Sequence, residues 1–171
     1  PALDFIFRRR SVRAFRSDPV PEAAIQNLLE AAMAAPTACN TRPWEFIVLT
    51  DCERLAAVAR LLPNGAFLAR APLGIVVLGD LGRAHAGELS YLLQDCSAAI
   101  QNLLLAAPAL GLGACWLGVH PRADRVDGLR QLFRLPEKII PVAVIALGFS
   151  ADSPPPPRTQ FDPARIHRQD W

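Results

Sequence analysis

Hydrophobic and polar positions follow two different periods along this chain, and the changes of period divide it into elements. Apolar residues three or four positions apart indicate helices, whereas short runs rich in Val, Ile and Leu indicate strands. The chain shows no internal repeat. The pattern predicts helices at 22–35, 52–62, 88–110 and 122–133, and strands at 45–50, 73–78, 114–119 and 140–147.

The longest predicted helix, 88–110, carries small and apolar residues on nearly every side, among them Tyr91 and Ile100. Such a helix is expected to be buried almost all round, either in the centre of the domain or against a second subunit. Pro108 should kink or end it.

The glycines after this helix look like the start of a dinucleotide-binding motif. Residues 111–116 read Gly-Leu-Gly-Ala-Cys-Trp, so Trp116 stands where the motif needs its third glycine. The segment also follows a helix, whereas the motif follows a strand. Gly111 and Gly113 are therefore predicted to end the helix and turn into the next strand, and a Rossmann domain is not expected.

Composition indicates a single globular domain spanning 1–171, with 51% hydrophobic and 20% charged residues. No signal peptide or membrane-spanning stretch is recognised, so a cytoplasmic protein without a membrane partner is expected. The cysteines are widely spaced and have no histidines at metal-ligand intervals, so they are predicted to be free and buried, and no metal site is expected. They are Cys39, Cys52, Cys96 and Cys115.

The N-terminal stretch combines basic and apolar residues. Its arginines are Arg8, Arg9, Arg10, Arg13 and Arg16. Its apolar residues, expected to anchor the stretch against the core, are Phe5, Phe7, Val12 and Phe15. Anchored guanidinium groups beside the Ser11 hydroxyl would form a site for a phosphate or a carboxylate. The alternatives are a solvated basic face or a nucleic-acid arm. Because the net charge is only +2, no nucleic-acid partner is expected.

A second informative stretch is the loop 35–44, which reads Ala-Pro-Thr-Ala-Cys-Asn-Thr-Arg-Pro-Trp. Its hydroxyls, amide and backbone N–H groups lie between a helix end and a strand. They could hydrogen-bond a planar heterocycle or a ribityl chain, although such residues are also common in loops for conformational reasons.

Together these segments resemble the FMN-dependent nitroreductase family in its short form. Residues 9–15 match an opening of the type Arg-Arg-Ser-Val-Arg before a Phe or Tyr. Residues 36–44 match Pro-Ser/Thr-x-x-Asn-x-Gln/Arg-Pro-Trp, and 95–118 match a buried helix leading into Gly-Leu-Gly-x-x-Trp-Ile/Leu-Gly. The resemblance covers nearly the whole chain.

The resemblance implies an α+β fold whose mostly antiparallel central sheet of about four strands is flanked by helices. It also implies a homodimer in which the C-terminal tail, 154–171, extends over the partner subunit. The implied cofactor is FMN, with NADH or NADPH as reductant and a nitro compound, quinone, flavin or similar small molecule as acceptor. Hydride would pass through flavin N5 in a ping-pong reaction, with no protein side chain as catalyst.

The same resemblance assigns cofactor-binding residues. Those expected at the FMN phosphate and the polar edge of the flavin are Arg9, Arg10, Ser11 and Arg13. Those expected from the other subunit, at the ring and ribityl chain, are Pro36, Thr37, Ala38 and Asn40. Those expected around the ring itself are Asn64 at its pyrimidine end, Leu117 and Gly118 beside N5, and Trp116 as a packing residue near the ring. Arg158 in the tail is expected to reach the phosphate across the dimer, although Gln160 stands where many members have a second basic residue.

Three alternatives remain open on the sequence. The protein could be a specialised enzyme of the same fold, acting as a ring dehydrogenase or as a reductive dehalogenase. The fold could also bind flavin without redox activity, as a sensor or interaction module.

Overall fold

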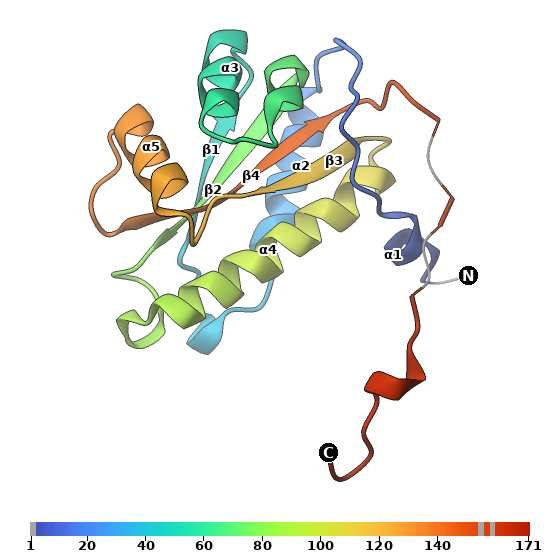
Figure 1. The fold of residues 1–171 in the computed structure, drawn as a ribbon, viewed down its shortest axis with the longest axis vertical. Coiled ribbons are helices and arrows are strands. Elements are labelled where there is room, and N and C mark those ends of the chain that lie inside the picture. Colours follow the sequence, from blue (N-terminus) through green and yellow to red (C-terminus); the bar gives the residue numbers. More distant parts are fainter. Residues whose placement is uncertain (1–2, 154–155, 158–159) are drawn as a thin grey trace.

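The computed structural model describes residues 3–153, 156–157 and 160–171 and has the predicted α+β architecture (Figure 1). Its four-stranded sheet is antiparallel throughout, in the order β1-β2-β4-β3. The strands are β1 (Trp44–Leu49), β2 (Leu73–Asp80), β3 (Gly113–Gly118) and β4 (Ile139–Gly148). The helices are α1 (Asp4–Arg8), α2 (Glu22–Met33), α3 (Cys52–Arg60), α4 (Leu89–Ala109) and α5 (Ala123–Phe133). Every predicted strand and helix is present.

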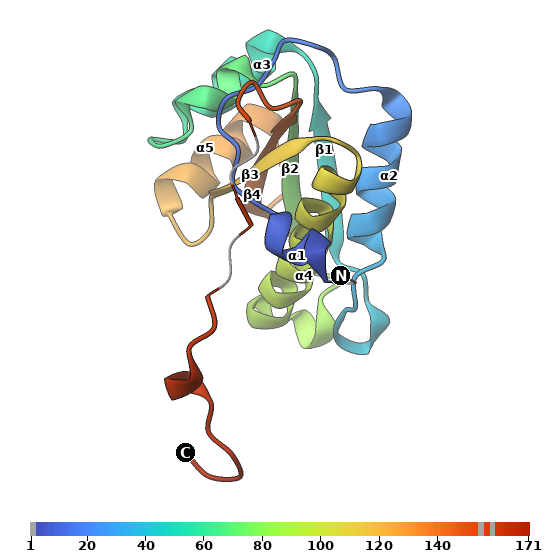
Figure 2. The ribbon, with the colours of Figure 1, turned by 90° about the vertical axis from the view of Figure 1, so that its right-hand side faces the viewer.

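Helices cover both faces of the sheet, with α2 on one side and α3 and α5 on the other in Figure 2. One core lies between the sheet and α2 and α4, and contains Leu28 and Leu103. A second core lies between the sheet and α3 and α5, and contains Leu55 and Leu129. Because the central strands β2 and β4 are covered on both faces, β2 is buried along its whole length and β4 along nearly all of it.

The C-terminal end of α4 confirms the role predicted for Gly111. This residue has φ +72°, a conformation that glycine adopts without steric cost. The N–H of Leu112 donates to the Ala107 carbonyl at 2.8 Å, and the N–H of Gly111 donates to the Pro108 carbonyl at 3.1 Å. These two bonds form a Schellman motif, which satisfies the last carbonyls of the helix. Pro108 lies in the last turn, one residue before the helix ends.

The prediction that this long helix is buried almost all round is wrong for the protomer. Leu92 and Ile100 are fully buried, but Tyr91 is 39% exposed, and Gln94 and Gln101 are also exposed. Because α4 lies across one face of the sheet beside α2, it leaves one side uncovered.

Residues 4–8 form the short helix α1, which the sequence pattern did not predict. Its helical period spreads the apolar side chains around the axis, so Phe5 and Phe7 are 46% and 39% exposed. The prediction that these two phenylalanines anchor the segment is therefore wrong for the protomer. Val12 and Phe15 are partly buried, and Val12 packs directly on Gly113.

All four cysteines are free, as predicted. Cys96 and Cys115 are buried, but Cys39 and Cys52 are exposed, so the prediction of burial is wrong for these two. Cys39 lies in a surface loop, and Cys52 lies in the first turn of α3. Burial, with the Asp95 carboxylate nearby, raises the pKa of the Cys96 thiol to about 12.

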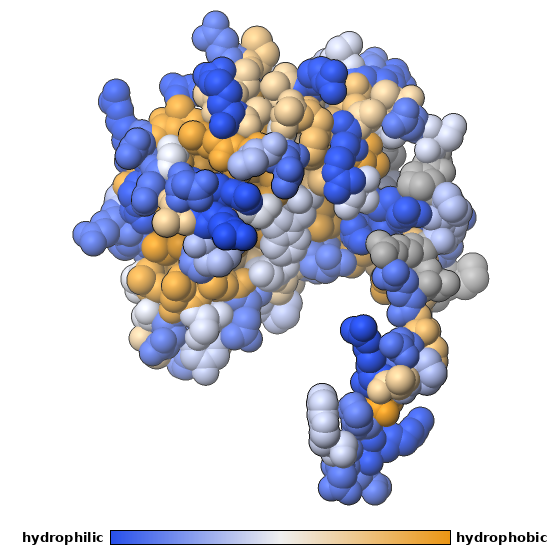
Figure 3. Space-filling view, in the orientation of Figure 1, coloured by the Kyte–Doolittle hydropathy of each residue, from blue (hydrophilic) through white to orange (hydrophobic). Residues whose placement is uncertain are grey.

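The chain leaves the domain after β4, and its last residues extend away from the body in Figure 3. Most of this surface is hydrophilic, but Phe161 is 79% exposed and Trp171 is fully exposed. His167 stacks on Trp171 with the ring centroids 4.3 Å apart, but among the described residues both aromatic side chains stay largely exposed.

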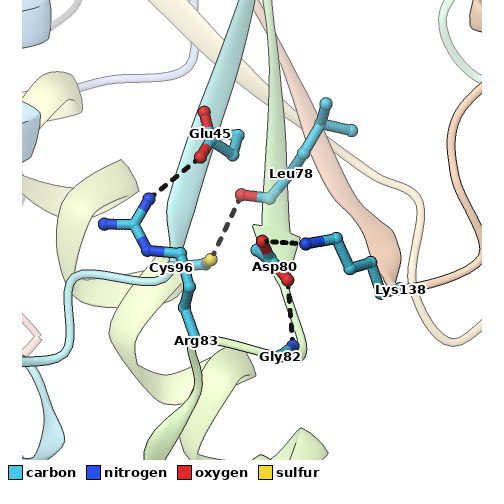
Figure 4. A network of polar contacts seen from close by, with 7 residues as sticks. All are labelled: Glu45, Leu78, Asp80, Gly82, Arg83, Cys96 and Lys138. Atoms are coloured by element: carbon cyan, nitrogen blue, oxygen red, sulfur yellow. Dashed lines mark hydrogen bonds and ion pairs between the residues drawn. The ribbon is translucent and has the colours of Figure 1, made fainter.

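A buried carboxylate holds the end of β2 (Figure 4). Asp80 is 6% exposed and accepts hydrogen bonds from Lys138 Nζ at 3.0 Å and from the Gly82 N–H at 2.9 Å. Beside it, Arg83 Nη1 pairs with Glu45 Oε1 at 3.1 Å. These contacts tie the turn after β2 to β1 and to the start of β4.

Among the residues that the structure describes, no helix is both long and apolar enough to span a membrane.

Candidate functional site

The N-terminal segment 9–15 lies beside β3, at one edge of the sheet. Ser11 forms a parallel bridge with Ala114, and the N–H of Val12 donates to the Ala114 carbonyl at 2.9 Å. The Val12 side chain covers Gly113 so closely that a Cβ at position 113 would lie 2.7 Å from Val12 Cβ. Backbone pairing and close packing thus fix the register of the segment against β3.

Three residues of the predicted phosphate site gather around the buried thiol of Cys115. Burial raises the pKa of this thiol, whereas the positive charge of Arg13, a hydrogen bond with Ser11 and the charge of Arg9 act in the opposite direction. Arg9, Ser11 and Arg13 are alternate residues of an extended segment, an arrangement that places side chains on one side of it.

Arg10 is directed elsewhere. Its Nη1 atom donates to the Pro156 carbonyl at 2.5 Å. With Arg8 and Arg16 it lines a separate hollow between the end of α4 and the C-terminal segment. The structure does not bring Arg10 together with the other three predicted ligands of the phosphate.

A pocket of about 200 Å³ opens where β3 ends. Arg13 reaches it from the N-terminal segment, and Asn64 reaches it from the turn after α3. Trp116, Leu117 and Gly118 line it from β3 itself. Five of the predicted cofactor residues, from three separate stretches of the chain, therefore share one pocket.

The backbone is accessible in this pocket. A Cβ built at Gly118 would meet no other atom within 4 Å, so the space beside this residue is open. Leu117, in contrast, is 8% exposed and points into the core beneath α3 and α5. A flat ring could therefore approach the end of β3 without meeting a side chain at position 118.

Sequence reasoning assigned no role in this pocket to Leu62, Gly65, Cys115 and Arg125. The charged residue among them, Arg125, lies in the first turn of α5. Its Nη1 atom donates to the Gly118 carbonyl at 2.7 Å. Its only signal in the sequence is a basic residue shortly after the strand end, at the start of a helix where acidic residues are favoured.

The other group of predicted cofactor residues lies in the loop after α2. The N–H of Ala38 donates to Asp95 Oδ1 on α4 at 3.0 Å, so Asp95 is a structural hydrogen-bond acceptor for this loop. Within the loop, the N–H of Arg42 donates to Thr37 Oγ1 at 3.1 Å, and Arg42 Nε donates to Asn40 Oδ1 at 3.0 Å.

This loop has an unusual backbone. Cys39, Asn40 and Arg42 have φ values of 50°, 57° and 49°, in the left-handed region that residues other than glycine seldom adopt. Such conformations each cost about 1–2 kcal/mol and persist where surrounding contacts impose them.

The loop and the pocket lie on opposite faces of the sheet. The loop is bonded to α4, whose buried side chains belong to the core shared with α2. The pocket adjoins Leu62 and Leu117, which belong to the core shared with α3 and α5. A single protomer therefore does not bring Pro36, Thr37, Ala38 and Asn40 to the pocket.

Arg158, the predicted cross-dimer phosphate ligand, lies outside the described residues. Within the described ranges, no group of three or more His, Cys, Asp or Glu side chains could hold a metal ion.

A model of the nitroreductase family matches residues 6–63 and 57–149. The chain belongs to the nitroreductase family. It is similar to a protein of Methanothermobacter thermautotrophicus that is provisionally named as an NADH dehydrogenase/NAD(P)H nitroreductase. The two are 46% identical over 169 residues, which cover 99% of this chain and 87% of that protein.

Solved structures of nitroreductase-family proteins have the same fold. A Parabacteroides distasonis protein with the same provisional name superposes with a TM-score of 0.92, at 40% identity, over 99% of this chain and 98% of its own. A protein of Desulfovibrio desulfuricans, provisionally a nitroreductase and solved in complex with FMN, superposes with a TM-score of 0.84. It is 30% identical to this chain, and the match covers 98% of this chain and 96% of that one. Family membership makes this nitroreductase-family protein an oxidoreductase.

The residues present fit FMN. A phosphate needs several donors, and Arg9, Ser11 and Arg13 provide them on one side of the segment. Among the ion pairs between described residues, none involves Arg9 or Arg13, so their charges are not neutralised by a carboxylate there. The open space beside Gly118 suits a flat ring.

Proposed function

We propose that this nitroreductase-family protein is an FMN-dependent NAD(P)H oxidoreductase that works as a homodimer. The observation that carries the proposal is the pocket at the end of β3, which gathers Arg13, Asn64, Trp116, Leu117 and Gly118. The FMN complex of the Desulfovibrio relative and the provisional name of the Methanothermobacter relative support the choice of cofactor and reductant.

The chain's own residues bind and orient the cofactor. Arg9, Ser11 and Arg13 hold the phosphate and the polar edge of the ring, through charge-assisted bonds worth about 1.5–3 kcal/mol each where desolvated. Asn64 has an amide that can donate to and accept from the pyrimidine end of the ring. The backbone at Leu117 and Gly118, which lines the pocket, would lie beside the reacting edge of the bound ring.

FMN, when bound, supplies the redox chemistry: it accepts a hydride from NADH or NADPH and passes electrons to a nitro compound, quinone, flavin or similar acceptor. The acceptor uses the space that the nicotinamide leaves, which is the structural basis of a ping-pong reaction. Leu117 keeps the floor of the pocket apolar, and the absent side chain at Gly118 leaves room for each substrate in turn.

Each site is completed by the loop 36–40 of the other subunit. This assembly accounts for two features of the protomer, namely that the loop lies on the far face of the sheet and that apolar residues are exposed. Those exposed residues include Phe5, Tyr91, Phe161 and Trp171. In the dimer the C-terminal tail extends over the partner, and Arg158 reaches the phosphate there.

The first test is an anaerobic absorbance titration of the FMN-reconstituted protein with NADH, then NADPH, followed by a quinone or a nitroarene. Bleaching of the oxidised flavin band and its recovery on adding the acceptor would support both half-reactions. A purified protein that binds no added FMN would contradict the proposal, and flavin that binds but never bleaches would leave a non-redox binding role.

Subunit mixing tests the shared site. Arg13→Ala and Asn40→Ala should each abolish activity in a homodimer, because each change then affects both sites. In a heterodimer of the two variants, one site carries both changes and the other carries neither. Activity regained after mixing and re-association supports two-subunit sites, and a mixture as inactive as its components contradicts them.

A further inference from the structure

Arg125 is a charged residue in the pocket to which neither the sequence pattern nor the family resemblance assigned a role. It projects from α5 and lines the pocket together with Arg13, Asn64, Trp116 and Gly118. Its Nη1 bond to the Gly118 carbonyl, at 2.7 Å, fixes one arm of the guanidinium on the last residue of β3.

The guanidinium is only partly satisfied. Its Nε atom is buried and has no hydrogen-bond partner among the described residues. The ion pairs found between described residues do not include Arg125. A planar group with five donors and a permanent charge thus faces the pocket with one arm anchored and with donor capacity unused.

The position of Arg125 does not favour the helix that carries it. It is the third residue of α5, where the helix dipole is positive and a cation is disfavoured. Arg130, in the last turn of the same helix, is on the favourable side of the dipole and donates to the Pro136 carbonyl at 2.8 Å. Both arginines bind a backbone carbonyl, but only Arg125 does so at an electrostatic disadvantage and at the pocket.

We infer that Arg125 is a positioning and charge-supplying residue that makes the pocket bind reduced FMN more tightly than oxidised FMN. This inference rests on the proposed function. Accepting a hydride adds one negative charge to the ring system, and a fixed guanidinium at the pocket stabilises that charge more than the neutral ring. Because the Arg125 side chain is partly buried, with its Nε atom shielded from solvent, its charge is screened less than that of a fully exposed arginine. The bond to Gly118 keeps the charge at a fixed place beside the end of β3.

The test is to measure the FMN reduction potential and the dissociation constant for oxidised FMN, in wild type and in variants. Arg125→Gln removes the charge and keeps a donor for the Gly118 carbonyl. Arg125→Lys keeps the charge but replaces the planar guanidinium and its five N–H donors by an ammonium group. Arg130→Gln is the matched control, since it removes the same charge and the same kind of bond from the other end of α5. Unfolding of each apo-protein shows whether the fold is intact.

We expect Arg125→Gln to lower the preference for reduced over oxidised FMN at least tenfold, which is about 30 mV for a two-electron couple. Arg125→Lys should retain most of the preference, and Arg130→Gln should change it less than twofold. The inference would be overturned if Arg125→Gln kept the wild-type preference for reduced FMN. It would also be overturned if Arg130→Gln lost as much of that preference as Arg125→Gln. Either result would leave the proposed function standing. If Arg125→Gln does not fold, the Arg125→Lys variant is the deciding test. Because it keeps the charge, a tenfold loss of the preference for reduced FMN in this variant would overturn the inference. A wild-type protein that binds no FMN would overturn both.

Discussion

The backbone N–H of Ala38 donates to Oδ1 of Asp95 across 3.0 Å, and this bond ties the strained loop after α2 to the longest helix. Asp95 is 5% exposed, and its Oδ2 atom has no partner among the described residues. Burying a carboxylate with so few hydrogen bonds costs free energy. We therefore explain Asp95 by its hydrogen bond to the loop and not by a contribution to the stability of the core.

Replacing Asp95 by Ala should destabilise the protein by about 1–3 kcal/mol, because the Ala38 N–H loses its acceptor. It should also weaken FMN binding, because the loop 36–40 loses the contact that holds its left-handed residues. Chemical denaturation and a fluorescence titration with FMN measure the two effects. Asp95→Asn keeps an oxygen acceptor and should restore most of the FMN affinity.

Asn102→Ala is the control for this loop. Asn102 is also on α4, and its Nδ2 atom donates to the Ala31 carbonyl at 3.1 Å, so the variant loses a comparable bond that does not involve the loop. Equal losses of FMN affinity in the two alanine variants would count against a specific role for Asp95.

Gly113→Ala should weaken FMN binding by displacing the N-terminal segment. The new Cβ would lie 2.7 Å from Val12 Cβ, and such overpacking typically costs about 1–3 kcal/mol. Relief of the clash moves Ser11 and Arg13 away from the pocket side of β3. Isothermal titration with FMN measures the loss.

The double variant Val12→Gly, Gly113→Ala removes Val12 Cβ together with both methyl groups, so it makes room for the added methyl group and should recover FMN affinity. Double-mutant analysis gives the coupling between the two positions. Additive losses would mean that Gly113 acts through something other than its contact with Val12.

Asp80 should make stability depend on pH below about 4. Desolvation alone would raise the pKa of its carboxyl, but the hydrogen bonds from Lys138 and Gly82 and the nearby positive charges outweigh it and leave the pKa below its ordinary value. A carboxyl whose pKa is lower in the folded state stabilises the fold above its unfolded pKa, near 3.9. That stabilisation is lost as the pH falls through the folded pKa.

We would measure the free energy of unfolding from pH 7 to pH 3 for wild type and for Asp80→Asn. The difference between the two proteins should become smaller below about pH 4. Lys138→Met removes one partner of Asp80 and keeps the hydrogen bond from the Gly82 N–H. In this background the stabilisation that Asp80 gives above pH 4 should be reduced but not lost. A difference between wild type and Asp80→Asn that stays constant over the whole range would show that ionised Asp80 contributes nothing to the pH dependence.

Thiol labelling under native conditions should reach two cysteines. Cys39 and Cys52 are exposed, whereas Cys96 and Cys115 are buried and have raised pKa values. Because the thiolate is the reactive form, Cys96, with a pKa of about 12, should react with Ellman's reagent only after unfolding. Cys39→Ser should remove half of the fast phase, and a third fast thiol in wild type would contradict the burial of Cys115.

Local patterns in the sequence were sufficient for most of the fold. Each helix and strand has a periodic run of its own, and caps such as Asp51, which accepts the Arg54 N–H at 2.9 Å, mark the ends. The short helix α1 was missed because three apolar residues in a row, Phe5 to Phe7, fit a strand as readily as one helical turn. Gln94 and Gln101 mark the exposed side of α4 in the sequence, but this signal was missed because Tyr91 was counted as buried.

The candidate site could be predicted only where the family motifs mark it. The motifs name Arg13 and Gly118, the wider resemblance adds Asn64, and the fold brings the three together. Arg125 has no motif, and its place in the pocket depends on how α5 returns over the end of β3, which no local pattern reports. The separation of Arg10 from Arg9 and Arg13 likewise follows from an extended backbone paired to an edge strand.

The strand order also sets when the protein can finish folding. The last strand to be synthesised, β4, lies between β2 and β3 and pairs with both. Until it leaves the ribosome, β3 has no strand to pair with, so Trp116, Leu117 and Gly118 have no fixed place. The pocket at the end of β3 is therefore assembled only after β4 has been made, and contacts between distant parts of the sequence should make this a slow step. Cells that produce the protein faster than it completes this pairing would accumulate apo-chains whose central β2 edge is open to aggregation.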